Sequence, residues 1–60
     1  MFHINQQVRS NKFGEGYVSE ISHREDGFVI TCIFSAENAQ GTIIYYNEDG
    51  KSPEDYICEL

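Results

Sequence analysis

Residues 28–34 read Phe-Val-Ile-Thr-Cys-Ile-Phe and decide the fold, because every one of them is apolar, aromatic or β-branched. Such side chains fit the pleated surface of a strand better than a helix. Side chains alternate between the two faces of a strand, and here both faces are mostly apolar. The stretch therefore predicts a central strand that is covered on both sides, with Phe28 and Phe34 in the core.

Four more runs with strand character flank this stretch, and turn-forming residues separate them. They are Gln6–Ser10, Tyr17–His23, Thr42–Tyr46 and Tyr56–Leu60. Asp26-Gly27 and Asp49-Gly50 are turn pairs in which glycine supplies the positive φ of a hairpin. Across the 60 residues, Ile, Val, Thr, Phe and Tyr number 20, whereas Leu, Ala and Met number four. The composition predicts an all-β protein.

Two local patterns refine this prediction. Val18 and Ile21 lie three positions apart, so a strand can bury both only with a bulge or a sharp bend between them. Ser52 fits a helix N-cap and Pro53 the first helical position, so one short helical turn is expected near residues 52–55. Five short strands with one tight bend predict a single domain over residues 1–60, a small five-stranded barrel.

The segment Val8–Ile21 carries a specific pattern, in which a Phe-Gly-Glu-Gly turn at residues 13–16 precedes a strand that contains Val18. This pattern resembles the first hairpin of SH3-like and Tudor-like barrels, such as the C-terminal Tudor-like module of bacterial repair helicases. In that family the module is a protein-interaction domain. The resemblance implies an SH3/Tudor-like barrel that contacts other proteins, such as the transcription machinery.

A second resemblance lies near the C-terminus. Residues 45–51 read Tyr-Tyr-Asn-Glu-Asp-Gly-Lys and are followed by Asp55 and a final apolar strand. They are similar to small bacteriophage proteins that combine a G-x-G-x-V start with a Tyr-x-x-Asp-Gly-Lys/Arg turn. The resemblance implies a phage-encoded accessory protein in the host bacterial cytoplasm. Such a protein would bind and inhibit or redirect a host protein, either a nucleic-acid enzyme or a defence factor.

Charge is distributed unevenly along the chain, which holds ten acids and four bases and has a net charge of −6. Residues 1–24 balance to +1, and residues 25–60 balance to −7. A negative field repels phosphate backbones and argues against direct nucleic-acid binding. It favours either simple solubility or an acidic face that docks on a basic protein surface. The weakest alternative, nucleic-acid binding, would use the N-terminal hairpin residues Arg9, Lys12, Phe13 and Arg24.

Patterns for catalysis, metals and membranes are not evident. Cys32, Cys58, His3 and His23 lack the close spacing of zinc ligands, and the paired carboxylates fall in expected turns. No apolar run is long enough for a membrane span, and the start lacks the features of a signal peptide. We therefore expect a cytoplasmic protein with no enzyme activity, cofactor or membrane partner, and with two free buried thiols.

Exposed aromatic and acidic side chains are the candidates for protein contact, because such patches are typical of interfaces. Tyr45 and Tyr46 are neighbours in a strand and point to opposite faces, so at least one should reach the surface. The candidate residues are Phe13, Tyr17, Tyr45, Tyr46, Glu48, Asp49, Glu54 and Asp55. They predict a non-enzymatic protein-binding module, unless the aromatic residues only close the ends of the barrel.

Self-association is the main alternative to a host target. A core built from 60 residues is marginal, and a homodimer would extend it. An edge strand such as Thr42–Tyr46 could pair with its copy by adding strand to strand. This alternative predicts a structural module that forms homodimers.

Overall fold

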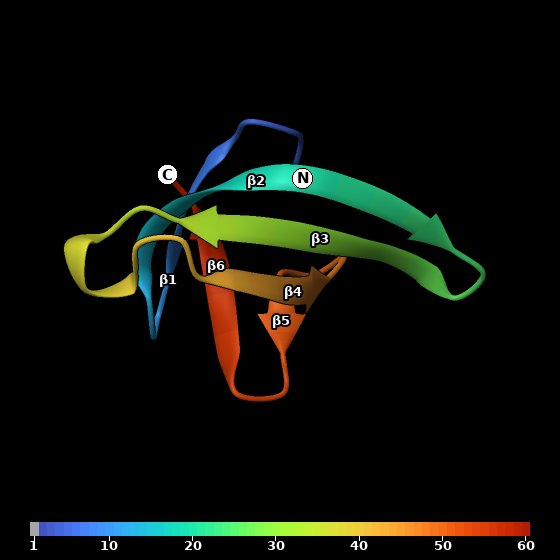
Figure 1. Cartoon of the computed structure of the whole chain (residues 1–60). Helices are drawn as coiled ribbons and strands as arrows, with labels where there is room; N and C mark the ends of the chain where they lie inside the picture. Colours follow the sequence, from blue (N-terminus) through green and yellow to red (C-terminus); the bar gives the residue numbers. More distant parts are fainter. Residues whose placement is uncertain (1) are drawn as a thin grey trace.

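Six strands and one short 3-10 helix form the described part of the computed structural model, which covers residues 2–60 (Figure 1). They are β1 (Gln7–Ser10), β2 (Gly14–Arg24), β3 (Gly27–Phe34), η1 (Glu37–Ala39), β4 (Ile43–Asn47), β5 (Lys51–Ser52) and β6 (Asp55–Glu59). The predicted all-β class is confirmed, and the five expected runs correspond to β1 to β4 and β6. The short strand β5 is a sixth strand that the sequence did not predict.

The strands form one antiparallel sheet in the order β4-β3-β2-β1-β6-β5. Its two end strands, β4 and β5, are consecutive in the chain and are joined by the short turn at residues 48–50. The turn brings the two ends of the sheet together, so the sheet curls into a nearly closed barrel (Figure 1).

The predicted irregularity in the second strand is confirmed. The pairing of β2 with β3 shifts register between Val18 and Glu20. Val18 lies opposite Cys32 before the shift, and Ile21 lies opposite Ile30 after it. The extra residue therefore turns both Val18 and Ile21 toward the barrel interior and bends β2 around the core.

Gly16 explains the Gly-x-Gly pattern at the start of β2. A Cβ atom at this position would lie 2.6 Å from the carbonyl oxygen of Ile33 and 2.6 Å from Cδ1 of Phe34. Since neither distance is compatible with a side chain, only glycine lets β2 pass this closely over β3. The pattern serves the close packing of the barrel wall.

The sequence predicted that both faces of β3 are covered, and the structure confirms this for the inward face only. Buried side chains line the interior and include Val8, Val18, Ile30, Cys32, Phe34, Ala39, Tyr46 and Ile57. Phe34 is fully buried, whereas Phe28 is only partly buried at the margin of the core. The outward residues Val29, Thr31 and Ile33 are half-exposed, and no second layer in residues 2–60 covers them. A single barrel has one interior, so the expected cover on both faces is wrong.

The expected helical turn at residues 52–55 is also wrong. Ser52 and Asp55 are paired across the β5–β6 hairpin, and the Ser52 hydroxyl donates to the Asp55 carbonyl at 3.3 Å. Pro53 and Glu54 form the turn between the strands. The Asp55 side chain bonds to residues inside the barrel, which holds the backbone in a hairpin. The single 3-10 turn of the described chain is η1 instead.

Candidate functional site

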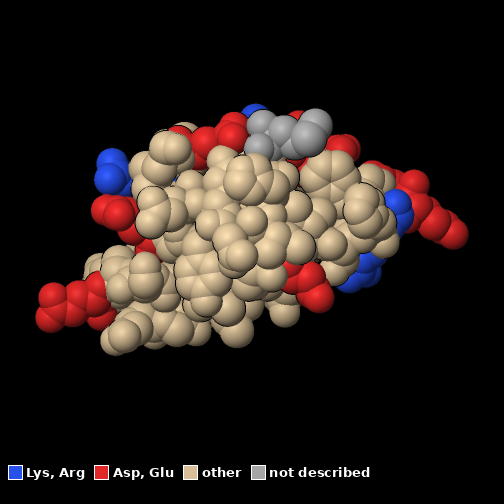
Figure 2. Space-filling view, turned by 90° about the horizontal axis from the view of Figure 1, so that it is seen from above, with Lys and Arg blue, Asp and Glu red and all other residues tan. Residues whose placement is uncertain are grey.

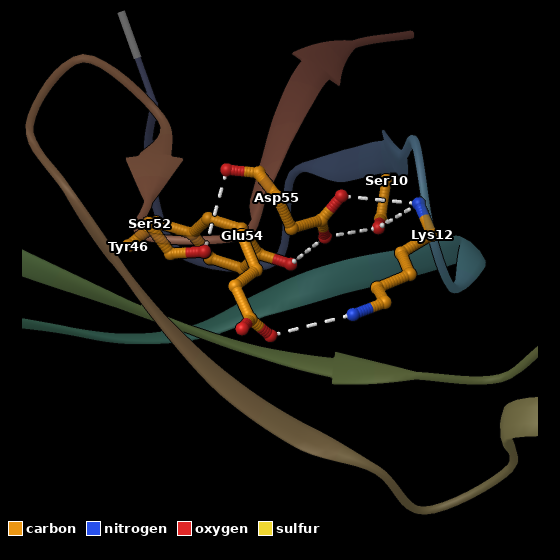
Figure 3. A network of polar contacts seen from close by, with 6 residues as sticks. All are labelled: Ser10, Lys12, Tyr46, Ser52, Glu54 and Asp55. Atoms are coloured by element: carbon orange, nitrogen blue, oxygen red, sulfur yellow. Dashed lines mark hydrogen bonds and ion pairs between the residues drawn. The ribbon is translucent and has the colours of Figure 1, made fainter.

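Ser10, Tyr46 and Asp55 form a buried hydrogen-bonded group, here named the closing cluster (Figure 3). The Tyr46 hydroxyl donates to Asp55 Oδ2 at 2.6 Å, and the Ser10 hydroxyl donates to the same oxygen. The backbone N–H of Lys12 donates to Asp55 Oδ1 at 3.0 Å. These bonds join β1, β4 and β6, so the closing cluster ties the end strand β4 across the open side of the barrel.

The electrostatics of the closing cluster keep Asp55 ionised and Tyr46 neutral. Burial alone would raise the pKa of Asp55, but hydrogen bonds from Ser10, Tyr46 and the backbone N–H groups of Tyr56 and Lys12 outweigh it and lower the pKa. Burial, and next the bond to Asp55, raises the pKa of Tyr46 well above its ordinary value. The sequence predicted Tyr46 and Asp55 as protein-contact residues. They are only 2% and 7% exposed, so their side chains are buried in the barrel instead of lying on its surface.

A hollow rich in carboxylates, here named the acidic hollow, opens at the same C-terminal end of β4, and Tyr46 belongs to both the hollow and the closing cluster. Its lining residues are Asp26, Phe28, Val29, Tyr45, Tyr46, Asn47, Glu48, Asp49, Lys51, Ser52 and Pro53. Three of these are acids and one is a base. The Tyr45 side chain is 63% exposed, so it offers an accessible aromatic ring beside the carboxylates.

Two turns deliver these carboxylates to one place. Asp26 belongs to the β2–β3 turn, and Glu48 and Asp49 belong to the β4–β5 turn. A Cβ atom on Gly27, whose φ is +131°, would lie 3.0 Å from Glu48 Oε1. The Glu48 carboxylate therefore lies directly against the β2–β3 turn. Gly27 is favoured by its positive φ, whereas the Glu48 carboxylate, at the end of a flexible side chain, could shift to admit a Cβ atom.

The β4–β5 turn is held by the side chain of Asn47. Its Oδ1 accepts hydrogen bonds from the backbone N–H of Asp49 at 2.9 Å and of Lys51 at 3.0 Å. An Asn side chain that bonds its own turn in this way fixes the local backbone. The positions of Glu48 and Asp49 are therefore set by the backbone of the turn.

Ion pairs in the described residues lie away from the acidic hollow. Arg9 pairs with Glu15 at 3.4 Å and Lys12 pairs with Glu54 at 3.5 Å, and all four side chains are exposed. Such surface pairs add only about 0–1 kcal/mol to stability. Because each pair places a carboxylate beside a base of the N-terminal hairpin, the hairpin is less suited to bind the phosphate groups of a nucleic acid. Figure 2 shows charged side chains mostly at the ends and rim of the face seen from above, with an uncharged middle.

The predicted interaction residues therefore separate into several places. Tyr45, Glu48 and Asp49 come together in the acidic hollow. Phe13 and Glu54 line a neighbouring hollow, which shares only Ser52 and Pro53 with the acidic one. Phe13 also packs on Phe34 with ring centroids 5.4 Å apart, so it contributes to the core margin.

Tyr17 lies apart from both hollows. It is 38% exposed and stands opposite Ile33 on the outer face of the sheet. Two lining residues of the acidic hollow, Asp26 and Phe28, were not among the contact residues that the sequence predicted. Their turn was recognised, but the β3–β4 pairing that brings it to residues 47–49 is a tertiary contact.

The two cysteines are free, as predicted, but only Cys32 is buried. Burial raises the pKa of its thiol to about 11. Cys58 is exposed, which corrects the expected burial, because it follows the inward Ile57 and so points outward. Residues 2–60 bring together no group of three or more His, Cys, Asp or Glu side chains suited to a metal ion. They also contain no helix with the length and apolar character to cross a bilayer.

Comparison with protein-family models, curated proteins and solved structures found no match to this chain. The fold and the chemistry of the acidic hollow are therefore the basis for assigning a function. An exposed tyrosine ring beside carboxylates is suited to a Lys or Arg side chain, which gains from both the ring face and the negative charge.

Proposed function

We propose that this chain is a non-enzymatic protein-binding module whose acidic hollow takes a Lys- or Arg-bearing segment of another protein. One observation carries the proposal: the exposed Tyr45 lines the same hollow as the acids Asp26, Glu48 and Asp49, against a single base, Lys51. Ion pairs within the described chain do not engage these three acids. Their charge is available to a partner.

The physical chemistry of the hollow favours a cation. A guanidinium or ammonium group over a tyrosine ring gains about 0.5–2 kcal/mol, depending on how far it is desolvated. The carboxylates add attraction that speeds encounter with a basic surface and that salt weakens. The net charge of −6 opposes a nucleic-acid ligand. The same charge suits a protein surface that itself holds nucleic acid.

We infer a biological setting from the sequence resemblances. The first hairpin is similar to a Tudor-like interaction module, and the segment at residues 45–51 is similar to small bacteriophage proteins. The first resemblance supports a protein-interaction barrel, and the second supports a phage-encoded accessory protein in the host bacterial cytoplasm. By occupying the basic site of a nucleic-acid enzyme or a defence factor, such a protein inhibits or redirects that host protein.

A binding role also agrees with how the closing cluster is used. Ser10 and Asp55 pair a hydroxyl with a carboxylate, which superficially suggests an activated nucleophile. However, Ser10 is 4% exposed, and its oxygen accepts the backbone N–H groups of Lys12 at 3.0 Å and Phe13 at 2.9 Å. The group is occupied in holding the barrel together.

The test is a comparison of captured proteins among matched variants. Tagged wild type, Tyr45→Ala and the double variant Glu48→Gln/Asp49→Asn are incubated with nuclease-treated bacterial lysate. Bound proteins are identified by mass spectrometry, and affinity is then measured with the purified partner. Glu37→Gln serves as the control, because Glu37 is an exposed acid on η1 outside the acidic hollow.

We expect one host protein whose affinity falls at least about tenfold in the double variant and in Tyr45→Ala, which is about 1.4 kcal/mol. Raising the salt concentration should weaken binding of the wild type. The control should bind as the wild type does. Equal capture by all four proteins, or binding that requires nucleic acid, would contradict the proposal.

A further inference from the structure

The two end strands of the sheet are protected very differently. End strands expose unpaired backbone N–H and C=O groups that can recruit another chain. β5 is only two residues long, carries Lys51 and is followed by Pro53, and all three features discourage pairing. β4 has none of these three features, since residues 42–46 read Thr-Ile-Ile-Tyr-Tyr without a charge. Although β5 lies near β4, the strand pairs of residues 2–60 do not join the two. β4 is the end strand at which another chain can add.

The direction of the free backbone groups follows from the pairing of β3 with β4. The N–H of Phe34 donates to the carbonyl of Thr42 at 2.9 Å, so Thr42 points its carbonyl at β3. Backbone groups alternate sides along a strand, so Ile43 and Tyr45 point theirs away from β3. The side chains of Ile43 and Tyr45 are also open, at 52% and 63% exposed. The same two residues thus present both free backbone groups and exposed apolar surface.

We propose that β4 pairs antiparallel with β4 of a second copy of this chain, about a two-fold axis at Ile44. In this register Ile43 of one copy lies opposite Tyr45 of the other, and each such pair can exchange two backbone hydrogen bonds. A β-branched residue opposite an aromatic one is a favourable cross-strand pair. The two-fold axis makes the same Ile43–Tyr45 contact form twice, once on each side of Ile44.

Charge restricts where two copies can meet. Each copy carries −6, so the copies repel one another at most approaches. Pairing about Ile44 avoids close repulsion, because residues 42–46 are uncharged and Glu48 falls opposite Gln40. The remaining repulsion is between more distant acids, which salt screens. The dimer is therefore expected to become stronger as salt is raised, opposite to the binding of a basic partner.

The size of the contact sets its strength. Stable interfaces bury about 1,200–2,000 Å² in total. One short strand pair on a chain with 4191 Å² of accessible surface supplies less than a stable dimer requires. The dimer should therefore be weak and should accumulate only at high protein concentration.

The test is the oligomeric state of the intact chain by sedimentation and by amide hydrogen exchange, over a range of protein and salt concentrations. Ile43→Lys places a charge in the pairing segment. Ile43→Pro removes a backbone N–H that the β3–β4 pairing does not use. Ile4→Lys is the matched control, because Ile4 is 53% exposed but lies in the N-terminal segment beside β2.

We expect the average mass of the wild type to rise from 6.9 kDa toward twice that value with concentration and with salt. The amides of Ile43 and Tyr45 should gain protection in parallel. Both Ile43 variants should reduce the association constant at least about tenfold, whereas Ile4→Lys should not. The exchange data on the wild type decide the matter even where a variant fails to fold.

Several results would overturn the proposal. A wild type that stays monomeric at the highest concentration excludes it, as does a dimer without protection at Ile43 and Tyr45. A dimer that survives Ile43→Pro, or that Ile4→Lys disrupts equally, places the contact elsewhere. These results leave the acidic hollow untouched, because the Glu48→Gln/Asp49→Asn variant tests that site without altering residues 42–46.

Discussion

The closing cluster and the acidic hollow use the same chemistry for opposite purposes. Each combines a tyrosine with carboxylate oxygens, and the two tyrosines, Tyr46 and Tyr45, are adjacent in β4. Tyr46 points inward and donates its hydroxyl to Asp55 at 2.6 Å. Tyr45 points outward and lines the hollow that Glu48 and Asp49 also line. The alternation of a strand thus places one tyrosine in the stabilising cluster and leaves the other exposed for the proposed binding.

The largest expected effect comes from breaking the closing cluster. Asp55→Ala leaves the hydroxyls of Ser10 and Tyr46 without their acceptor, whereas the backbone N–H of Lys12 keeps its bond to Ser10 Oγ. Each unsatisfied buried group costs about 1–3 kcal/mol, so the total loss should be about 2–6 kcal/mol. A domain of this size is stable by only about 5 kcal/mol, so the variant should be largely unfolded. Urea unfolding followed by circular dichroism measures the effect, and a variant as stable as the wild type would contradict it.

The adjacent tyrosines give a matched test of the comparison. Tyr46→Phe removes one hydrogen bond to the buried Asp55 carboxylate and should cost about 2 kcal/mol. Tyr45→Phe removes an exposed hydroxyl and should change the unfolding free energy by less than about 0.5 kcal/mol. Both values come from urea unfolding curves at neutral pH. Equal losses in the two variants would mean that the inward and outward tyrosines do not differ in role.

Acid should weaken the closing cluster in a definite direction. The folded state lowers the pKa of Asp55 below its unfolded value of about 3.9. The stabilising contribution of the carboxylate is therefore complete above that value and disappears as the pH falls through the folded pKa. In Tyr46→Phe one hydrogen bond that lowers this pKa is missing, so the loss should begin at a higher pH.

The measurement is the NMR titration of the carboxyl carbon of the Asp55 side chain, together with unfolding curves from pH 7 to pH 2. The exposed Glu59 complicates the unfolding curves alone, because a hydrogen bond from Gln6 also lowers its pKa. The difference between wild type and Tyr46→Phe isolates Asp55. An Asp55 pKa above its ordinary value would contradict the assignment.

The smallest expected stability effect belongs to the acidic hollow. Glu48→Gln/Asp49→Asn removes two exposed charges that ion pairs in the described chain do not engage. Its unfolding free energy should stay within about 0.5 kcal/mol of the wild type, even though binding of a basic partner falls. Calorimetry of unfolding, with Glu37→Gln as the control, measures this. A loss comparable to that of Tyr46→Phe would show that the hollow is structural.

The sequence predicted one interaction surface, and the structure divides it. Phe13, Tyr17 and Tyr45 all looked like exposed aromatic residues in turns or strands. The folded chain places Phe13 against Phe34, Tyr17 on the outer sheet face and Tyr45 at the acidic hollow. Local patterns carry no information about which of these lie together, because strand pairing between distant residues decides it.

What the sequence determined by itself follows from short-range rules. The alternation of residues 28–34, the turn glycines and the three-residue spacing of Val18 and Ile21 indicate an all-β barrel with a bulged strand, and the structure has both. Only the tertiary structure decided that Asp55 lies inside and Asp49 outside, although each lies in an acidic turn. Ser10 and Tyr46 reach Asp55 from strands that are remote along the chain, and their hydrogen bonds outweigh the cost of burying its charge.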